Sequence, residues 1–156
     1  MNDHLRMLAV DYGSKRIGVA VSDPLGITAQ PIPYIRNLKR EQVLSDLKKI
    51  IEERSVGIVI VGLPRSLDGT LGPKAAQCRK LARQIEEECG VSVSLFDESF
   101  TTRDAEEILV RDLNLSRAKR KEVIDSMAAC LILKYYMNDS CSPLPGRERM
   151  KGEGGK

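Results

Sequence analysis

The run Gly57–Ile58–Val59–Ile60–Val61–Gly62 constrains the fold more than any other segment of the chain. Its four central residues are all β-branched, and such a run is typical of a strand that is buried on both faces of a parallel sheet. An amphipathic helix is predicted on each side of it, over Arg40–Ile51 and Ala75–Ile85, because apolar residues recur there at spacings of three and four. Since parallel strands are joined by helical crossovers, this pattern indicates an α/β fold.

Three further strands are predicted before this unit, over Met7–Val10, Ile17–Val21 and between Ile27 and Ile35. The first strand ends at Asp11, and the short link after it favours an antiparallel hairpin. Pro31 and Pro33 cannot donate to a ladder of hydrogen bonds, so we place the third strand towards an edge of the sheet.

The chain after Gly90, which is expected to end the second helix, continues the alternation of strands and helices. A strand over Val91–Phe96 leads into Asp97 and Glu98. A short helix is predicted from Thr101 through Leu109, and a final helix from after Ser116 to about Met137. The expected fold is a mixed sheet, antiparallel in its first three strands and parallel afterwards, flanked by helices. We expect one domain over residues 1–138 and a flexible tail over residues 139–156, which are rich in Ser, Pro, Gly and charge.

The composition excludes several classes of protein. The chain has no Trp, four Tyr and two Phe, so recognition of nucleic acid by rows of stacking aromatics is not expected. The four cysteines show no C-x-x-C spacing and His4 is the only histidine, which excludes a zinc site of the usual kinds. The apolar run Ile58–Val61 is far shorter than the roughly 20 residues of a membrane helix, and no signal peptide is recognisable. We therefore expect a cytoplasmic protein with reduced thiols.

Three acidic residues form the candidate site. Asp11 and Glu98 follow strands whose carboxyl ends are expected to meet at one edge of the sheet, where ligands of α/β proteins bind. Asp125 lies in a predicted helix among apolar neighbours, and an acid on the border of a buried face is costly unless it is paired, protonated or bound to a metal. Carboxylates without a nearby histidine suit hard cations such as Mg²⁺ or Mn²⁺. Each acid considered singly is also compatible with an ordinary turn or cap, so only their combination favours a metal site.

Four motifs, in order along the chain, resemble those of one family. They are Asp11–Asp23 (DYGSKRIGVAVSD), Gly62-Leu63-Pro64 with Asp68-Gly69-Thr70, Asp97-Glu98 with Thr101-Thr102, and Asp125–Ala129 (DSMAA). Together they resemble the YqgF/RuvX family of Holliday-junction-resolvase-like proteins. The sequence departs from the family pattern at Ser99, where the family usually has an arginine that could contact a phosphate or an acid.

The resemblance implies a ribonuclease-H-like fold and places the metal-binding, catalytic acids at Asp11, Glu98 and Asp125. It implies a metal-dependent endonuclease that acts in processing of the ribosomal small-subunit RNA precursor, at its 5′ end. The alternatives are resolution of DNA four-way junctions and nucleic-acid binding without cleavage. An ATP-binding protein of the actin and sugar-kinase type also opens in this way, but it pairs two such domains, and this chain has room for one.

Phosphodiester hydrolysis by such a site uses two divalent ions about 4 Å apart. We expect Asp11 to bridge the ions and Glu98 and Asp125 to complete one side each, with Asp97 either a helper behind the ligands or a turn acid. The net charge of only +3 does not by itself indicate a polyanionic partner, so the positions of the basic residues must indicate one. Lys15, Arg16, Arg65 and Arg103 lie close in sequence to the motifs and are the predicted nucleic-acid contacts.

The Arg117–Lys121 cluster is left open as a nucleic-acid contact. The expected partner is nucleic acid, an RNA precursor ahead of a DNA junction. Either a monomer or a homodimer is compatible with the sequence, because only a symmetric junction would require two copies.

Overall fold

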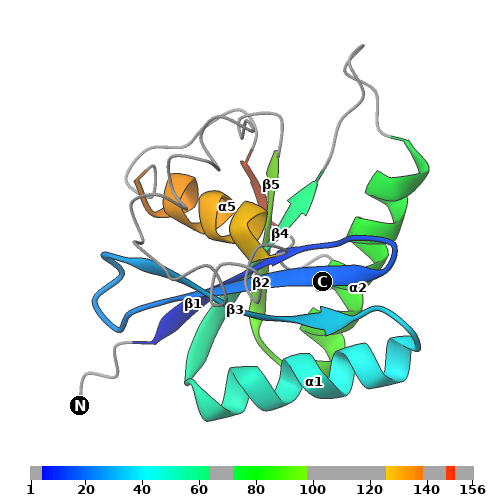
Figure 1. Ribbon diagram of the computed structural model, residues 1–156, viewed down its shortest axis with the longest axis horizontal. Helices are drawn as coiled ribbons and strands as arrows, with labels where there is room; N and C mark the ends of the chain where they lie inside the picture. The colour runs from blue at the N-terminus through cyan, green and yellow to red at the C-terminus, as the bar shows by residue number, and fades with distance from the viewer. Residues whose placement is uncertain (1–4, 64–71, 98–125, 139–146, 150–156) are drawn as a thin grey trace, which may run out of the picture.

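The computed structural model describes residues 5–63, 72–97, 126–138 and 147–149. Its centre is a six-stranded sheet in the order β3-β2-β1-β4-β5-β6 (Figure 1). The strands are β1 (Arg6–Asp11), β2 (Arg16–Ser22), β3 (Ala29–Arg36), β4 (Val56–Leu63), β5 (Ser92–Asp97) and β6 (Arg147–Arg149). β1 pairs antiparallel with β2 and β2 with β3, whereas β4 pairs parallel with both β1 and β5. The predicted mixed sheet, antiparallel first and then parallel, is confirmed.

The third strand lies at an edge of the sheet, as its prolines predicted. Pro31 pairs with Ala20 of β2, and no described strand lies on the other side of β3. The register between the two strands shifts, because Ile17 pairs with Ile35 but Val19 pairs with Ile32. β3 thus carries one extra residue there, which is a β-bulge.

Helices α1 (Arg40–Glu53) and α2 (Pro73–Cys89) cover one face of the sheet (Figure 1). Their apolar sides pack on the side chains of β1 and β4 that alternate towards this face, such as Val10 and Val61. The two helices predicted on either side of β4 are confirmed, and so is the predicted end of the second helix at Gly90. This glycine follows α2 with a φ of 66°, in the left-handed region that favours glycine.

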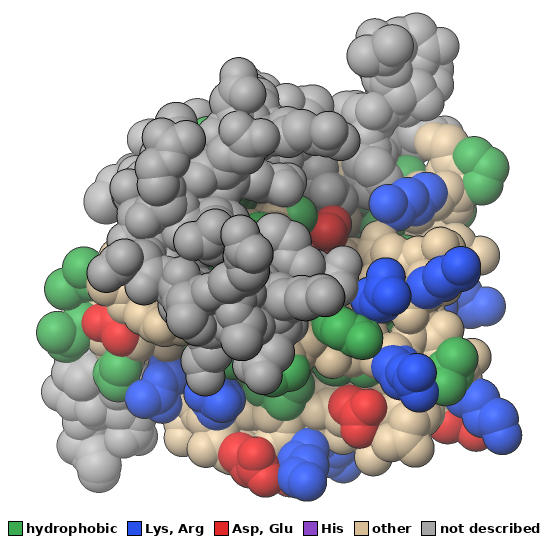
Figure 2. All heavy atoms as spheres, in the orientation of Figure 1, with side chains coloured by type: hydrophobic (Ala, Val, Ile, Leu, Met, Phe, Trp, Pro, Cys, Tyr) green, Lys and Arg blue, Asp and Glu red, His purple; other side chains and the backbone are tan. Residues whose placement is uncertain are grey.

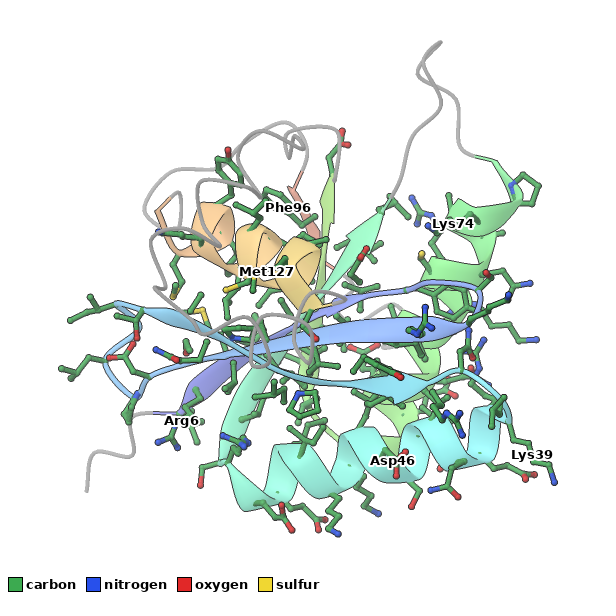
Figure 3. All side chains as sticks on the ribbon, viewed as in Figure 1. Arg6, Lys39, Asp46, Lys74, Phe96 and Met127 are labelled. Atoms are coloured by element: carbon green, nitrogen blue, oxygen red, sulfur yellow. The ribbon has the colours of Figure 1, made fainter. Side chains whose placement is uncertain are left out.

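Helix α5 (Met127–Asn138) covers the opposite face. Three alanines, Ala9, Ala20 and Ala29, supply the sheet surface beneath it and allow a close approach of helix and sheet. Phe96 of β5 and Met127 of α5 are both buried in this layer (Figure 3). The layered α/β arrangement therefore has a larger core under α1 and α2 and a smaller one under α5.

Several predicted elements fall outside the described residues. They are the helix from Thr101 through Leu109 and the part of the final helix before Ser126. The sequence predicts a flexible tail over residues 139–156. The structure differs from this prediction at β6, whose three residues pair antiparallel with Ser94, Leu95 and Phe96 of β5. The sequence gives no strand period there, because three residues are too few to show one. The boundary of the single domain stays a prediction.

No helix in the described part of the chain is long and apolar enough to cross a membrane. The cytoplasmic location inferred from the sequence stays a prediction.

Cys130 of α5 lies in the core between this helix and the sheet, where it has no exposed surface and its thiol donates to the carbonyl of Ala29 over 3.4 Å. Burial raises the pKa of this thiol from 9.0 to about 12. The unfolded chain therefore loses this proton at a lower pH than the folded chain, so stability is full below pH 9 and declines as the pH rises towards 12.

We expect the free energy of unfolding of the wild type to fall by about 1 kcal/mol more than that of Cys130→Ala when the pH is raised from 8 to 10. Urea denaturation at both pH values measures this difference. The same pH dependence in the two proteins would contradict the assignment. Cys130→Ser, which keeps a neutral donor, is the matched control and should behave as Cys130→Ala does.

Candidate active site

Asp11 is the last residue of β1 and lies half-buried at the carboxyl ends of the parallel strands. Alternation along β1 places it on the face of Ala9, which is the face covered by α5. Asp11 pairs with Gly18 of β2, and the ladder with β4, whose last pair is Val10 with Val61, brings it level with Gly62. Both neighbours of Asp11 in the sheet are thus glycines, so no side chain stands beside the carboxylate on either strand.

Asp97 lies at the same edge but on the other face. It ends β5, pairs with Leu63 of β4 and is buried, with 7% of its surface exposed. Alternation along β5 puts Asp97 on the face of Leu95, which packs under α1 and α2. Of the two roles considered for Asp97, this placement favours a structural acid at the strand end over a helper behind Asp11.

Ser126 fixes the start of α5 on the sheet. Its side chain has no exposed surface, and its hydroxyl accepts a hydrogen bond from the backbone N–H of Val19 at 3.0 Å. The same hydroxyl donates to the carbonyl of Ile32 at 2.6 Å. Both partners lie at the bulge between β2 and β3, where the ladder is irregular. A side chain therefore takes the place of a backbone partner at this point, one residue from the pair of Gly18 and Asp11.

The structure describes some of the predicted site residues and not others. Asp11, Lys15 and Arg16 are described, whereas Glu98, Asp125, Arg65, Arg103 and the Arg117–Lys121 cluster lie outside the described residues. Within the described ranges, no group of three or more His, Cys, Asp or Glu side chains could hold a metal ion. The described chain nevertheless reaches Asp97 and Ser126, the direct sequence neighbours of two of the predicted ligands.

Basic side chains gather where the β1–β2 turn, the end of β3 and the start of α1 meet (Figures 1 and 2). Lys15 and Arg16 are exposed in this turn, and the guanidinium carbon of Arg16 lies 5.4 Å from the centre of the Tyr34 ring. Arg40 of α1 stands in a similar way over Tyr12, 5.5 Å from the ring centre. The two predicted phosphate contacts that the structure describes are therefore accessible at the edge that carries Asp11.

Two hydrogen bonds hold the β1–β2 turn against the end of β3. The side-chain amide of Asn37 donates to the carbonyl of Gly13 at 2.8 Å, and the backbone N–H of Asn37 donates to the carbonyl of Lys15 at 2.9 Å. Gly13 is closely packed, because a Cβ added there would collide with the backbone carbonyl of Arg16. The turn therefore requires glycine at this position for lack of space.

We expect Gly13→Ala to lower the free energy of unfolding by about 1–3 kcal/mol, since the backbone of the turn must move to admit the methyl group. Thermal denaturation followed by circular dichroism measures the loss. Ser14→Ala, an exposed change in the same turn, serves as the control and should leave the midpoint within about a degree. A Gly13→Ala midpoint equal to that of the wild type would show that the turn is not confined.

Sequence reasoning missed four residues of this region: Gly18, Tyr34, Asn37 and Ser126. Gly18 and Ser126 stand inside two of the recognised motifs, and a glycine within an apolar strand is a sequence signal of close approach. Asn37 and Tyr34 carry no such signal. Their roles come from the pairing of β2 with β3, which no local pattern reveals.

Comparison with known proteins gives a consistent result. Residues 5–139 match a family model described as "RuvX: Holliday junction resolvase". A protein of Thermoanaerobacter pseudethanolicus named "Putative pre-16S rRNA nuclease" is 40% identical over 134 residues, which span 86% of this chain and 96% of the relative. A relative of the same name from Carboxydothermus hydrogenoformans is 41% identical over the same length.

Among solved structures, Thermus thermophilus RuvC aligns with a TM-score of 0.63 at 13% identity, over 94% of this chain and 100% of that chain. At so low an identity the likeness shows the fold alone, and it is the ribonuclease-H-like fold expected from the motifs. The family resemblance of the sequence motifs is confirmed as well. Together with the match over 134 residues to relatives named as nucleases, these findings show that the chain is a ribonuclease-H-like nuclease and a member of the RuvX family.

Proposed function

We propose that this chain is a metal-dependent endonuclease that hydrolyses phosphodiester bonds of the small-subunit ribosomal RNA precursor and contributes to maturation of its 5′ end. The observation that carries the proposal is the position of Asp11, a carboxylate at the carboxyl edge of the sheet with a glycine on each side. Because Gly18 and Gly62 have no side chains, they suit the close approach of a phosphate and its ions to the backbone beside Asp11.

Glu98 and Asp125 are proposed as the other two ligands, and the described chain supports this at both positions. Glu98 follows Asp97 at the end of β5, and Asp125 precedes Ser126, which is hydrogen-bonded to Val19. Consecutive Cα atoms lie about 3.8 Å apart, so Glu98 is attached to the end of β5, two strands from Asp11, and Asp125 is attached to the residue that is bonded to Val19. The proposal thus needs no large rearrangement of the sheet or of α5.

The residues fit a hard divalent cation, because all three proposed ligands are carboxylates and Mg²⁺ or Mn²⁺ prefers oxygen donors. Two such ions, when bound, would activate a water molecule and stabilise charge on the leaving oxygen. Asp11, Glu98 and Asp125 would hold the ions. By holding the ions in place, the three carboxylates would align the scissile phosphate.

The nucleic acid is proposed to lie along the exposed basic turn. Lys15 and Arg16 would neutralise phosphates beside the site, and Arg65 and Arg103 are proposed as further contacts. An RNA precursor is favoured because relatives 40% identical to this chain are named for it. The second candidate is a DNA four-way junction, since a structure titled as T. thermophilus RuvC with Holliday junction substrate has a TM-score of 0.60. Cleavage of a symmetric junction would need a homodimer, and cleavage of RNA would not.

The test is cleavage of labelled ribosomal precursor RNA and of a four-way DNA junction, each with Mg²⁺, with Mn²⁺ and with EDTA. Metal-dependent cleavage of the RNA alone is the expected result. Cleavage of the junction alone would replace the substrate and keep the chemistry. A folded protein that cuts neither, at any millimolar metal concentration, would overturn the proposal in favour of a binding role.

A further inference from the structure

A groove of about 390 Å³ opens between the β1–β2 turn and the end of β3, beside the proposed catalytic edge. Lys15, Arg16, Tyr34, Arg36 and Leu38 line it, and we refer to it as the basic groove. A second hollow of about 450 Å³ adjoins it over α1 and shares Tyr34, Arg36 and Leu38. Volumes of this size are ordinary for sites that take a small organic group. Lys39, labelled in Figure 3, lies on the same side of the molecule, at the start of α1.

The charges of the basic groove fit an anion. Arg16 and Arg36 pair directly across β2 and β3, and like charges in that position repel each other. Lys15 adds a third cation, and none of the described residues that line the groove is acidic. Asp46 lies in the adjoining hollow, where it accepts a hydrogen bond from Gln42 of its own helix. A phosphate between the two arginines would accept hydrogen bonds from both guanidinium groups.

The groove also offers a flat and apolar surface, which a bare anion would not use. Tyr34 is half-buried, and the guanidinium carbon of Arg16 lies 5.4 Å from the centre of its ring, within the range of a cation–π contact. Leu38 has 76% of its surface exposed at the rim. Aromatic rings and arginine planes are the surfaces on which unpaired bases stack.

The position of the groove connects it to the proposed site. Alternation along β2 places Arg16 on the face of Gly18, the residue that pairs with Asp11. Arg16 is two residues from Gly18, a distance of about 7 Å along a strand. A polynucleotide that crosses Asp11 therefore passes directly onto the basic groove.

We propose that the basic groove binds one unpaired nucleotide of a single-stranded segment next to the cleavage site. The base stacks beside Leu38 on the surface that Tyr34 and Arg16 form, and its phosphate lies between Arg16 and Arg36, near Lys15. The proposal deepens the nuclease function and rests on it for the placement of the scissile phosphate. It does not conflict with the scarcity of aromatics in the sequence, because one stacking side chain is enough for one base.

The experiment measures binding without cleavage. A fluorescein-labelled 12-nucleotide single-stranded RNA and a blunt duplex of the same sequence are titrated in EDTA and followed by fluorescence anisotropy. The variants are Tyr34→Ala, Tyr34→Phe and Arg36→Gln. Arg83→Gln is the matched control, an exposed arginine of α2 that does not line the groove. Circular dichroism verifies that each variant is folded.

We expect Tyr34→Ala to weaken binding of the single strand about tenfold or more and to weaken binding of the duplex less than about twofold. Tyr34→Phe keeps the ring and should bind as the wild type does. Arg36→Gln should lower the slope of log Kd against log salt concentration by about 0.7, the contribution of one phosphate contact on a single strand. Arg83→Gln should change neither quantity.

Equal losses on single strand and duplex, or wild-type binding by Tyr34→Ala, would overturn the groove as a site for an unpaired base. The readout is independent of the nuclease proposal, since no metal is present. Tyr34-dependent binding by a protein that cuts nothing would keep the groove and reject the nuclease. Metal-dependent cleavage with no effect of Tyr34 or Arg36 would keep the nuclease and reject the groove.

Discussion

Replacing Asp11 with asparagine is expected to reduce metal-dependent cleavage by at least about a hundredfold. The change is nearly isosteric but removes the negative charge between the proposed ions. Metal catalysis supplies several kcal/mol of transition-state stabilisation, and each 1.4 kcal/mol corresponds to about a factor of ten in rate. Single-turnover cleavage of labelled precursor RNA measures the loss directly. The folded structure should persist, because Asp11 is only half-buried and both of its strand neighbours are glycines.

Asp97→Asn is the matched control for this prediction. Asp97 ends a neighbouring strand at the same edge, but alternation puts its side chain on the face under α1 and α2. We expect it to keep cleavage within about tenfold of the wild type, because its side chain lies on the opposite face of the sheet from Asp11. A second readout is the midpoint of thermal unfolding, which millimolar Mg²⁺ should raise in the wild type and not in Asp11→Asn. Full activity of Asp11→Asn would reject the assignment of the site.

Removing the hydroxyl of Ser126 is expected to have the largest effect on stability. Ser126→Ala leaves the N–H of Val19 and the carbonyl of Ile32 without their partner in a site with no exposed surface. Each unsatisfied buried group costs about 1–3 kcal/mol, so the expected loss is about 2–4 kcal/mol. For a chain of this length the loss corresponds to a fall of roughly 5–15 °C in the unfolding midpoint. Urea and thermal denaturation both measure it.

Ser94→Ala is the control for Ser126→Ala. Ser94 is equally buried and faces the same core, but its hydroxyl has one long contact of 3.5 Å with the hydroxyl of Tyr136. We expect a loss below about 1 kcal/mol there. Similar losses of unfolding free energy for the two variants would show that the number and geometry of the hydrogen bonds do not determine the destabilisation. Ser126→Ala should also reduce the rate of cleavage, because Ser126 holds the end of α5 next to Asp125.

The architecture was predictable because each element carries its own local signal. The β-branched run of β4 and the helix patterns on either side of it imply parallel crossovers. The prolines of β3 indicate an edge strand. Residues such as Gly90 mark helix ends by a conformation that other residues adopt at a cost. Each of these signals extends over only a few neighbouring residues, and local patterns of this kind can be recognised in a single sequence.

The details of the site were less predictable, because they depend on contacts between distant residues. The hydrogen bond from Val19 to Ser126 spans 107 positions of the chain, and that from Ser126 to Ile32 spans 94. Periodicity in the sequence identified α5 as a helix but could not show that its first turn is bonded to a bulge. The proposed role of Asp125 came from its place among apolar residues and from the family motif, and the structure adds the hydrogen bonds of its sequence neighbour Ser126.

The same limit explains the basic groove. The sequence indicated a basic turn at Lys15 and Arg16. Tyr34 and Arg36 belong to β3, and the sequence predicted of this strand only that it lies at an edge of the sheet. Their proximity to the turn follows from the pairing of Arg16 with Arg36 and from the bonds of Asn37. A bulge of one residue decides which β3 side chains share a face, and no local pattern specifies a bulge.

The edge position of β3 also affects how molecules of this protein associate. Pro31 and Pro33 carry no N–H, and the bulge interrupts the spacing of the remaining donors. A strand from another molecule would therefore find a broken row of partners rather than a regular ladder. Exposed edges of long, regular strands promote fibril growth, and β3 lacks that regularity. Concentrated solutions of the folded protein should thus resist strand-by-strand aggregation along this edge.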